Sequence, residues 1–295
     1  MNGRVTQRML TNTSLDYLQL GLGRLAKVQE QLSTGRVLNR PSDNPTDVTA
    51  AMRLRTSMAQ QEQYSRNAND GVGWLSQVDS TLDTVTLSVR RARELAIQGA
   101  NTAAQGQAAR DALATEVEEL RAGLLSSANA TYLNRPIFGG ITGDPQAFDS
   151  TGTWVGVAGD VTRRVADGVT VKVDVDGRDV FGNGAASVFQ ELEDLATALR
   201  AGDGTAIRTG IDDLKTRLET VTSARTAAGT RLDRIEKADA SAISAHQSLA
   251  ATLSTLENTD LAKAAVDLQL QEVAYQAALA ATSRVLQPSL IDFLR

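Results

Sequence analysis

The 295-residue sequence contains no cysteine. A thiol nucleophile, a disulfide framework and a cysteine-based metal site are therefore excluded. The single histidine, His246, has no local partner of the kind that general acid–base catalysis requires, so we interpret it as a structural residue. The absence of cysteine also fits a protein that leaves the cell unfolded. The residues thus give no indication of an enzyme.

Aromatic residues are also scarce, at 4% of the chain, and the formal net charge is −5. Few aromatics favour thin helical layers over a thick globular core. The acidic balance gives no indication of nucleic-acid binding. No run approaches about 18 consecutive apolar residues and the first ten residues have no signal-peptide core, so we expect no membrane insertion and no cleaved secretory signal.

A heptad pattern of leucines occupies the N-terminal region, where Gln29 stands at the one position that lacks a leucine. Such spacing predicts a helix that packs against another helix. Gly21 and Gly23 weaken this helix by about 1 kcal/mol each relative to alanine, so alone it should be marginal. We predict that this side of the helix is an assembly interface formed by Leu15, Leu18, Leu22, Leu25 and Leu32.

The stretch LSTGRVLNRPSDNP, residues 32–45, interrupts the helical pattern. Gly35 can end a helix in the left-handed conformation, and Asn44 followed by Pro45 is typical of a helix start. A second break is predicted at residues 258–260, Asn-Thr-Asp. The chain therefore changes helix once near each end.

The C-terminal helix that follows carries two apolar stripes, which indicates more than one helical partner. The first stripe completes the predicted assembly interface with Leu268, Tyr275, Leu279, Leu286, Leu290 and Phe293. The second stripe lies on a neighbouring face and consists of Val266, Leu270, Val273 and Ala277.

Between the ends, long helical seams flank a region rich in glycine and aspartate. Val169, Val171, Val173 and Val175 alternate with other residues, which predicts a strand, and Asp176–Gly177 would then be a hairpin turn. We predict three domains. These are a terminal coiled-coil assembly domain (1–40 and 259–295), a helical rod (41–132 and 185–258) and a small β-rich insertion (133–184).

Two patterns mimic ligand sites. Asp174, Asp176 and Asp179 resemble the start of a calcium loop, but the glycine comes too early and the twelfth residue, Ala185, has no carboxylate. GLGRLA, residues 21–26, matches a loose dinucleotide fingerprint without the strand that such a motif requires. We therefore predict no catalytic residue, no cofactor site and no metal site.

Several segments together resemble the flagellin superfamily. Residues 12–51 are similar to its characteristic start and residues 274–295 to its end. LSTGRVLNRPSDNP, LNRPIFGGITGDPQAF (residues 133–148) and VDVDGRDVFG (residues 173–182) resemble the hook-associated, junction-forming branch of that superfamily. Flagellin itself carries a different connector, SGxRINSAxDD, where this chain has residues 38–45.

The resemblance implies a mainly α fold, an elongated antiparallel helical bundle or coiled coil formed by both chain ends, with a small β-rich insertion in the middle. It implies a secreted structural subunit of the bacterial flagellum that forms a ring between hook and filament. The implied partners are copies of itself, the first junction protein, flagellin, an export chaperone and the flagellar type III export apparatus. Two alternatives stay open, namely a short flagellin and, remotely, an enzyme or ligand-binding module in the β insertion.

Overall fold

The computed structural model describes residues 2–101 and 106–286, and the chain divides into two compact units. The terminal unit combines residues up to Ala59 with those from Gln247 onward, and the central unit spans Gln60–His246. Seven α-helices and two small antiparallel sheets occur in the described ranges. The prediction of a mainly α chain with a small β-rich region in its middle is confirmed.

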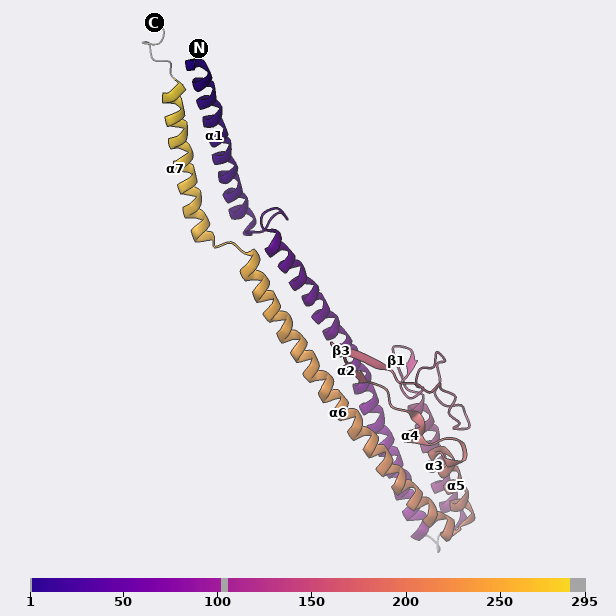
Figure 1. Ribbon diagram of the computed structural model, residues 1–295. Coiled ribbons are helices and arrows are strands. Elements are labelled where there is room, and N and C mark those ends of the chain that lie inside the picture. The colour runs from indigo at the N-terminus through magenta and orange to yellow at the C-terminus, as the bar shows by residue number, and fades with distance from the viewer. Residues whose placement is uncertain (1, 102–105, 287–295) are drawn as a thin grey trace. The chain divides into compact units, whose positions relative to one another are not determined.

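In the terminal unit, helix α1 (Asn2–Thr34) packs along helix α7 (Leu261–Leu286), and the two helices run antiparallel (Figure 1). The unit also holds the first turns of α2 (Pro45–Asn101) and the last turns of α6 (Gly204–Glu257). The two chain ends therefore pair with each other, as the sequence predicts.

The α1–α7 contact follows one inner row on each helix, spaced alternately by four and three residues. These rows are Ser14, Leu18, Gly21, Leu25, Val28 and Leu32 on α1, and Ala264, Leu268, Gln271, Tyr275, Ala278 and Thr282 on α7. All are half-buried except Ala264, which is buried. Half of the α7 row is alanine or threonine, so this seam buries little apolar area and stabilises the pair weakly.

The central unit has the main hydrophobic core. From α2 it takes a strict heptad row of buried residues, Leu75, Val78, Leu82, Val85, Val89, Ala92 and Ala96. From α6 it takes every seventh residue, Ile207, Leu214, Val221, Ala228, Ile235 and Ala242. Arg225 of α6 bridges Asp79 and Asp83 of α2 beside this core. Helix α3 (Gln107–Ala128) packs against α5 (Val188–Ala201).

The β-rich region belongs to the central unit. Strand β1 (Thr131–Tyr132) pairs with β2 (Arg135–Pro136), and β3 (Thr162–Ala166) pairs with β4 (Val169–Lys172). A five-residue helix, α4 (Gly177–Phe181), and a 3₁₀ turn (Gly184–Ala186) complete it. Four of the chain's few aromatic residues pack together here, namely Phe138, Phe148, Phe181 and Phe189.

The hairpin turn predicted at Asp176–Gly177 is wrong. The β3–β4 hairpin turns at Asp167–Gly168, where Gly168 has a φ of 66°. Asp176 instead caps α4, because its side chain accepts a hydrogen bond from the Arg178 backbone N–H. A second turn, not predicted, joins β1 to β2 through Leu133 and Asn134, whose φ angles are 48° and 62°.

Candidate assembly interface

Of the eleven residues predicted to form the assembly interface, five lie in the seam between α1 and α7. Leu18, Leu25 and Leu32 belong to the inner row of α1, and Leu268 and Tyr275 to that of α7. Their side chains are half-buried against the opposite helix of the same chain. Within one chain, these residues hold the two ends together.

Three others lie beside the seam. Leu15, Leu22 and Leu279 are 48%, 52% and 43% exposed. Each follows an inner-row residue by one position, so all three project toward the same edge of the antiparallel pair. Leu286 is the last residue of α7, while Leu290 and Phe293 lie outside the described residues.

The second stripe of α7 lies on the face opposite the seam. Val266, Leu270 and Val273 are 58%, 63% and 66% exposed, and Ala262 and Ala277 extend the same face. We call these five residues the outer face of α7. No residue of the described ranges covers it, and large exposed apolar patches often mark interaction sites in proteins. The two-stripe pattern of the sequence indicated such a second partner.

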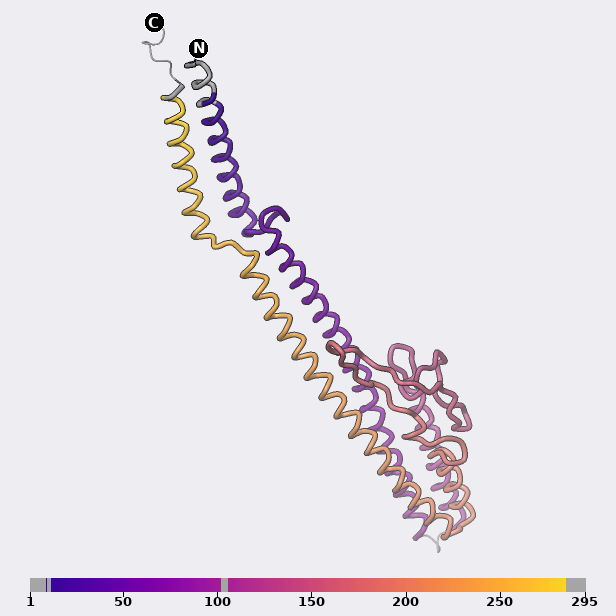
Figure 2. Tube along the Cα trace, in the orientation of Figure 1, coloured from indigo at the N-terminus to yellow at the C-terminus, as the bar shows by residue number. Residues whose placement is uncertain are grey.

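The breaks at the two chain ends meet in a small backbone ladder, which we call the clasp and define as residues 35–37 with 257–259 (Figure 2). Arg36 and Asn258 form an antiparallel β-bridge. The Val37 N–H donates to the Glu257 carbonyl at 2.7 Å, and the Thr259 N–H donates to the Gly35 carbonyl at 2.9 Å. The sequence predicts both breaks but gives no sign that they bond to each other.

One side-chain contact holds the clasp itself and another fixes the loop beside it. Glu257, which is 6% exposed, accepts a 2.7 Å hydrogen bond from Arg55 of α2. Asp43 lies 3.0 Å from the Lys27 ammonium of α1 and accepts the backbone N–H groups of Asn39 and Arg40. The Lys27 hydrogen bond, with these N–H groups, lowers the pKa of the Asp43 carboxyl. The loop between α1 and α2 is thereby fixed to α1.

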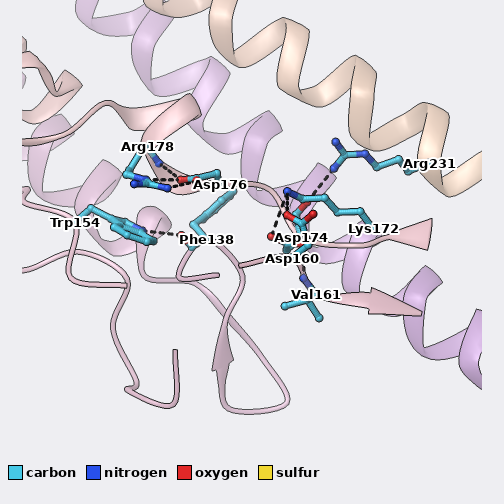
Figure 3. A network of polar contacts seen from close by, with 9 residues as sticks. All are labelled: Phe138, Trp154, Asp160, Val161, Lys172, Asp174, Asp176, Arg178 and Arg231. Atoms are coloured by element: carbon cyan, nitrogen blue, oxygen red, sulfur yellow. Dashed lines mark hydrogen bonds and ion pairs between the residues drawn. The ribbon is translucent and has the colours of Figure 1, made fainter. Parts of the chain in front are cut away.

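The clearest polar network elsewhere surrounds Asp174 in the central unit (Figure 3). Asp174 is 1% exposed, and its carboxylate accepts the Val161 N–H at 2.8 Å and lies 3.8 Å from the Lys172 ammonium. Arg231 of α6 donates to the Asp174 backbone carbonyl. Burial raises the pKa of the Asp174 carboxyl, although Val161 and Lys172 oppose the shift. These contacts tie the β3–β4 hairpin to α6.

Asp176, close to this network, has a partner of its own. Its carboxylate pairs with Arg178, whose guanidinium also lies 4.3 Å from the centre of the Trp154 ring (Figure 3). Across the described residues, no group of three or more histidine, cysteine, aspartate or glutamate side chains is placed to hold a metal ion. Asp174 and Asp176, two of the three aspartates that resemble a calcium loop, thus have local partners in Val161 and Arg178.

A search for membrane spans among the described helices finds none with the length and apolarity to cross a bilayer. Two family models match the chain. The bacterial flagellin N-terminal helical region matches residues 5–141, and the bacterial flagellin C-terminal helical region matches residues 211–294.

Among curated proteins, the chain is similar to flagellar hook-associated protein 3 of two bacteria. It is 27% identical to that of Escherichia coli strain K12 over 79% of this chain and 78% of the relative. It is 29% identical to that of Salmonella typhimurium over 62% of this chain, but this match spans only about half, 55%, of the relative.

Among solved structures, hook-associated protein 3 of Legionella pneumophila superposes with a TM-score of 0.63. The match covers 70% of this chain and 98% of that one, at 16% identity, so it shows a shared fold. The paired helical ends, the two family models that match them and these relatives agree with one another. The chain belongs to the flagellin superfamily, and it is similar to flagellar hook-associated protein 3.

Proposed function

We propose that this chain is a structural subunit of the bacterial flagellum at the junction between hook and filament. The observation that carries the proposal is the uncovered outer face of α7 on a pair of helices that match both flagellin models. A chain that keeps three large aliphatic side chains of one helix in water gains stability when a neighbouring subunit covers them. Two of its relatives carry hook-associated names, which favours the junction. A flagellin is also similar, at 25% identity over 88% of this chain, so the filament subunit remains the alternative.

The partners proposed with this role are copies of the chain in a ring, the first junction protein on the hook side and flagellin on the filament side. Export through the flagellar type III apparatus, with a cytoplasmic chaperone beforehand, would place the protein outside the cell. The weak α1–α7 seam supports this route, because a marginal pair of helices is readily unfolded for export.

We also propose that the eleven interface residues act in assembly, together with the outer face of α7. The three-domain division goes with this role. Residues 1–40 and 259–295 would assemble, 41–132 and 185–258 would form the rod, and 133–184 the β-rich insertion.

Deletion of the gene tests the proposed function. We expect hooks without filaments and flagellin shed into the medium, restored by the gene in trans. A deletion strain with normal filaments would overturn the proposal. Long filaments grown by the purified chain alone would favour the alternative of a short flagellin.

The enzyme or ligand-binding alternative has its own test in the β-rich insertion. A hydrolytic activity of the purified chain that disappears on changing Asp174 or Asp176 would support it. The structure gives both carboxylates local roles, on the Val161 N–H and at the start of α4, which favours the structural subunit.

A further inference from the structure

The residues of the α1–α7 seam do little to favour one register of the two helices over another. The inner row of α7 consists mostly of small or polar residues, Ala264, Gln271, Ala278 and Thr282. A slip of one heptad would place similar residues opposite each other along most of the seam. Among the described residues of the two inner rows, the aromatic ring of Tyr275, which packs over Gly21, most clearly distinguishes one register from the next.

The clasp, in contrast, can form in one register only. Its two backbone hydrogen bonds and its β-bridge join residues 35–37 to residues 257–259. A slip of one heptad would move α1 along α7 by about 10 Å, at 1.5 Å per residue, and would separate every one of these groups. The backbone groups of Gly35, Glu257 and Thr259, which are buried or half-buried residues, would then lose their partners.

We propose that the clasp sets the register in which α1 pairs with α7. Each partner in the clasp has a fixed position. Gly35 has a φ of 69° and bonds to Gln31 of α1, so the ladder begins at a defined point after the helix. Glu257 is held by Arg55 of α2, and Asp260 starts α7 by accepting the N–H groups of Ala262 and Lys263.

The register decides which exposed residues lie together on the pair. With Gly21 against Tyr275, the antiparallel rows place Leu15 of α1 near Leu279 of α7 on the same edge. A one-heptad slip would separate these two leucines and produce a different apolar surface. This consequence rests on the proposed assembly function, whereas the register itself does not.

Engineered cysteines can measure the register, because the natural chain has none. Counting from Gly21 opposite Tyr275, Leu25 lies opposite Gln271, so Leu25→Cys with Gln271→Cys reports the native register. Leu25→Cys with Ala278→Cys reports the register slipped by one heptad. Both are made in the full-length chain and oxidised under dilute conditions, and the yields of intramolecular disulfide are compared. We expect the native pair to exceed the slipped pair by roughly tenfold or more, since a disulfide requires close Cα atoms.

The clasp is then opened by Val37→Pro together with Thr259→Pro, which removes both N–H donors. Proline favours an extended preceding residue, and Arg36 and Asn258 already pair as extended backbone. The matched control, Val37→Ala with Thr259→Ala, keeps both donors. We expect the ratio of native to slipped disulfide to fall toward one in the proline variant and to stay high in the control.

An unchanged ratio in the proline variant would overturn the proposal, as would equal yields in the chain with its clasp intact. Equal yields in the proline variant alone support it, whether the helices slide or separate, because native pairing then depends on the clasp. Tryptophan fluorescence checks that the central unit, which contains both Trp74 and Trp154, stays folded. The disulfides form in the free chain, so a failure of the proposed function would appear only in the deletion strain.

Discussion

Gly21 of α1 lies under the ring of Tyr275 of α7. A Cβ built at Gly21 would be 3.4 Å from Cδ2 of Tyr275, which is ordinary van der Waals contact. A glycine that weakens α1 as an isolated helix thus forms part of the α1–α7 seam. Gly23, two residues later, is exposed and meets nothing within 4 Å.

These two glycines give the first prediction. Gly23→Ala should increase the stability of α1 by about 1 kcal/mol, because alanine is the better helix former and nothing obstructs it. Gly21→Ala should do nearly the same, whereas Gly21→Leu should displace Tyr275 and weaken the pair. Thermal melting followed by far-UV circular dichroism measures all three. A stabilising Gly21→Leu would show that Tyr275 does not pack on this position.

The second prediction concerns the outer face of α7. Leu270→Asp should leave the folding of the free chain unchanged within about 0.5 kcal/mol, because Leu270 is 63% exposed. It should abolish filament attachment if a neighbouring subunit covers this face, since the interface would then bury an unpaired charge. Swimming assays and electron microscopy of flagella provide the readout.

Ala265→Asp is the control for this experiment. It adds the same charge to an exposed position of α7 that lies about 140° around the helix from Leu270, outside the outer face, and motility should persist. Equal loss of motility in both variants would mean that charge anywhere on α7 is harmful. Normal filaments with Leu270→Asp would contradict the assignment of the outer face to assembly.

The third prediction follows from the buried Asp174. Its pKa is raised in the folded chain, so its contribution to stability is complete below the unfolded value of 3.8 and is lost as the pH rises through the folded pKa. Asp174→Asn keeps an acceptor for the Val161 N–H without a charge. It should therefore stabilise the central unit at pH 7 by about 1 kcal/mol, and the gain should shrink in acid.

Urea unfolding followed by tryptophan fluorescence at pH 7 and at pH 4 tests whether the stability gain from Asp174→Asn shrinks in acid. Asp174→Ala is the contrast, because it leaves the Val161 N–H without its acceptor and should cost about 1–3 kcal/mol. A gain from Asp174→Asn that is larger in acid than at neutral pH would contradict the raised pKa.

Much of the helical architecture could be predicted from the sequence because it depends on local signals. Gly35, the Asn44–Pro45 pair and the segment at 258–260 mark the breaks, and heptad rows mark the buried sides. The sequence predicts Leu15 and Leu22 in the α1 seam, whereas the inner row contains the residues just before them, Ser14 and Gly21. The heptad pattern follows the leucines because they are the more hydrophobic of each pair. Packing on Tyr275, which decides between these rows, involves a distant part of the chain.

The position of the hairpin turn and the existence of the clasp could not be predicted from neighbouring residues in the sequence. Two Asp–Gly pairs, 167–168 and 176–177, have the same turn chemistry, and only the first joins strands. The pairing of β3 with β4 and the capping of α4 decide between them. The clasp forms through main-chain hydrogen bonds such as that between Val37 and Glu257. Because almost every residue type offers the same main-chain groups, the sequence does not reveal this pairing.

The last prediction concerns the Arg55–Glu257 pair that supports the clasp. Glu257 is 6% exposed while Arg55 is about half exposed, so loss of the arginine leaves a buried carboxylate without its partner. Arg55→Met, which keeps the aliphatic stem, should destabilise the terminal unit by about 1–3 kcal/mol.

Arg53→Met is the control, because no ion pair joins Arg53 to any described residue. Hydrogen exchange at the Val37 and Thr259 amides, which donate in the clasp, should accelerate in Arg55→Met and not in the control. Equal protection of these amides in both variants would show that the clasp closes without Arg55.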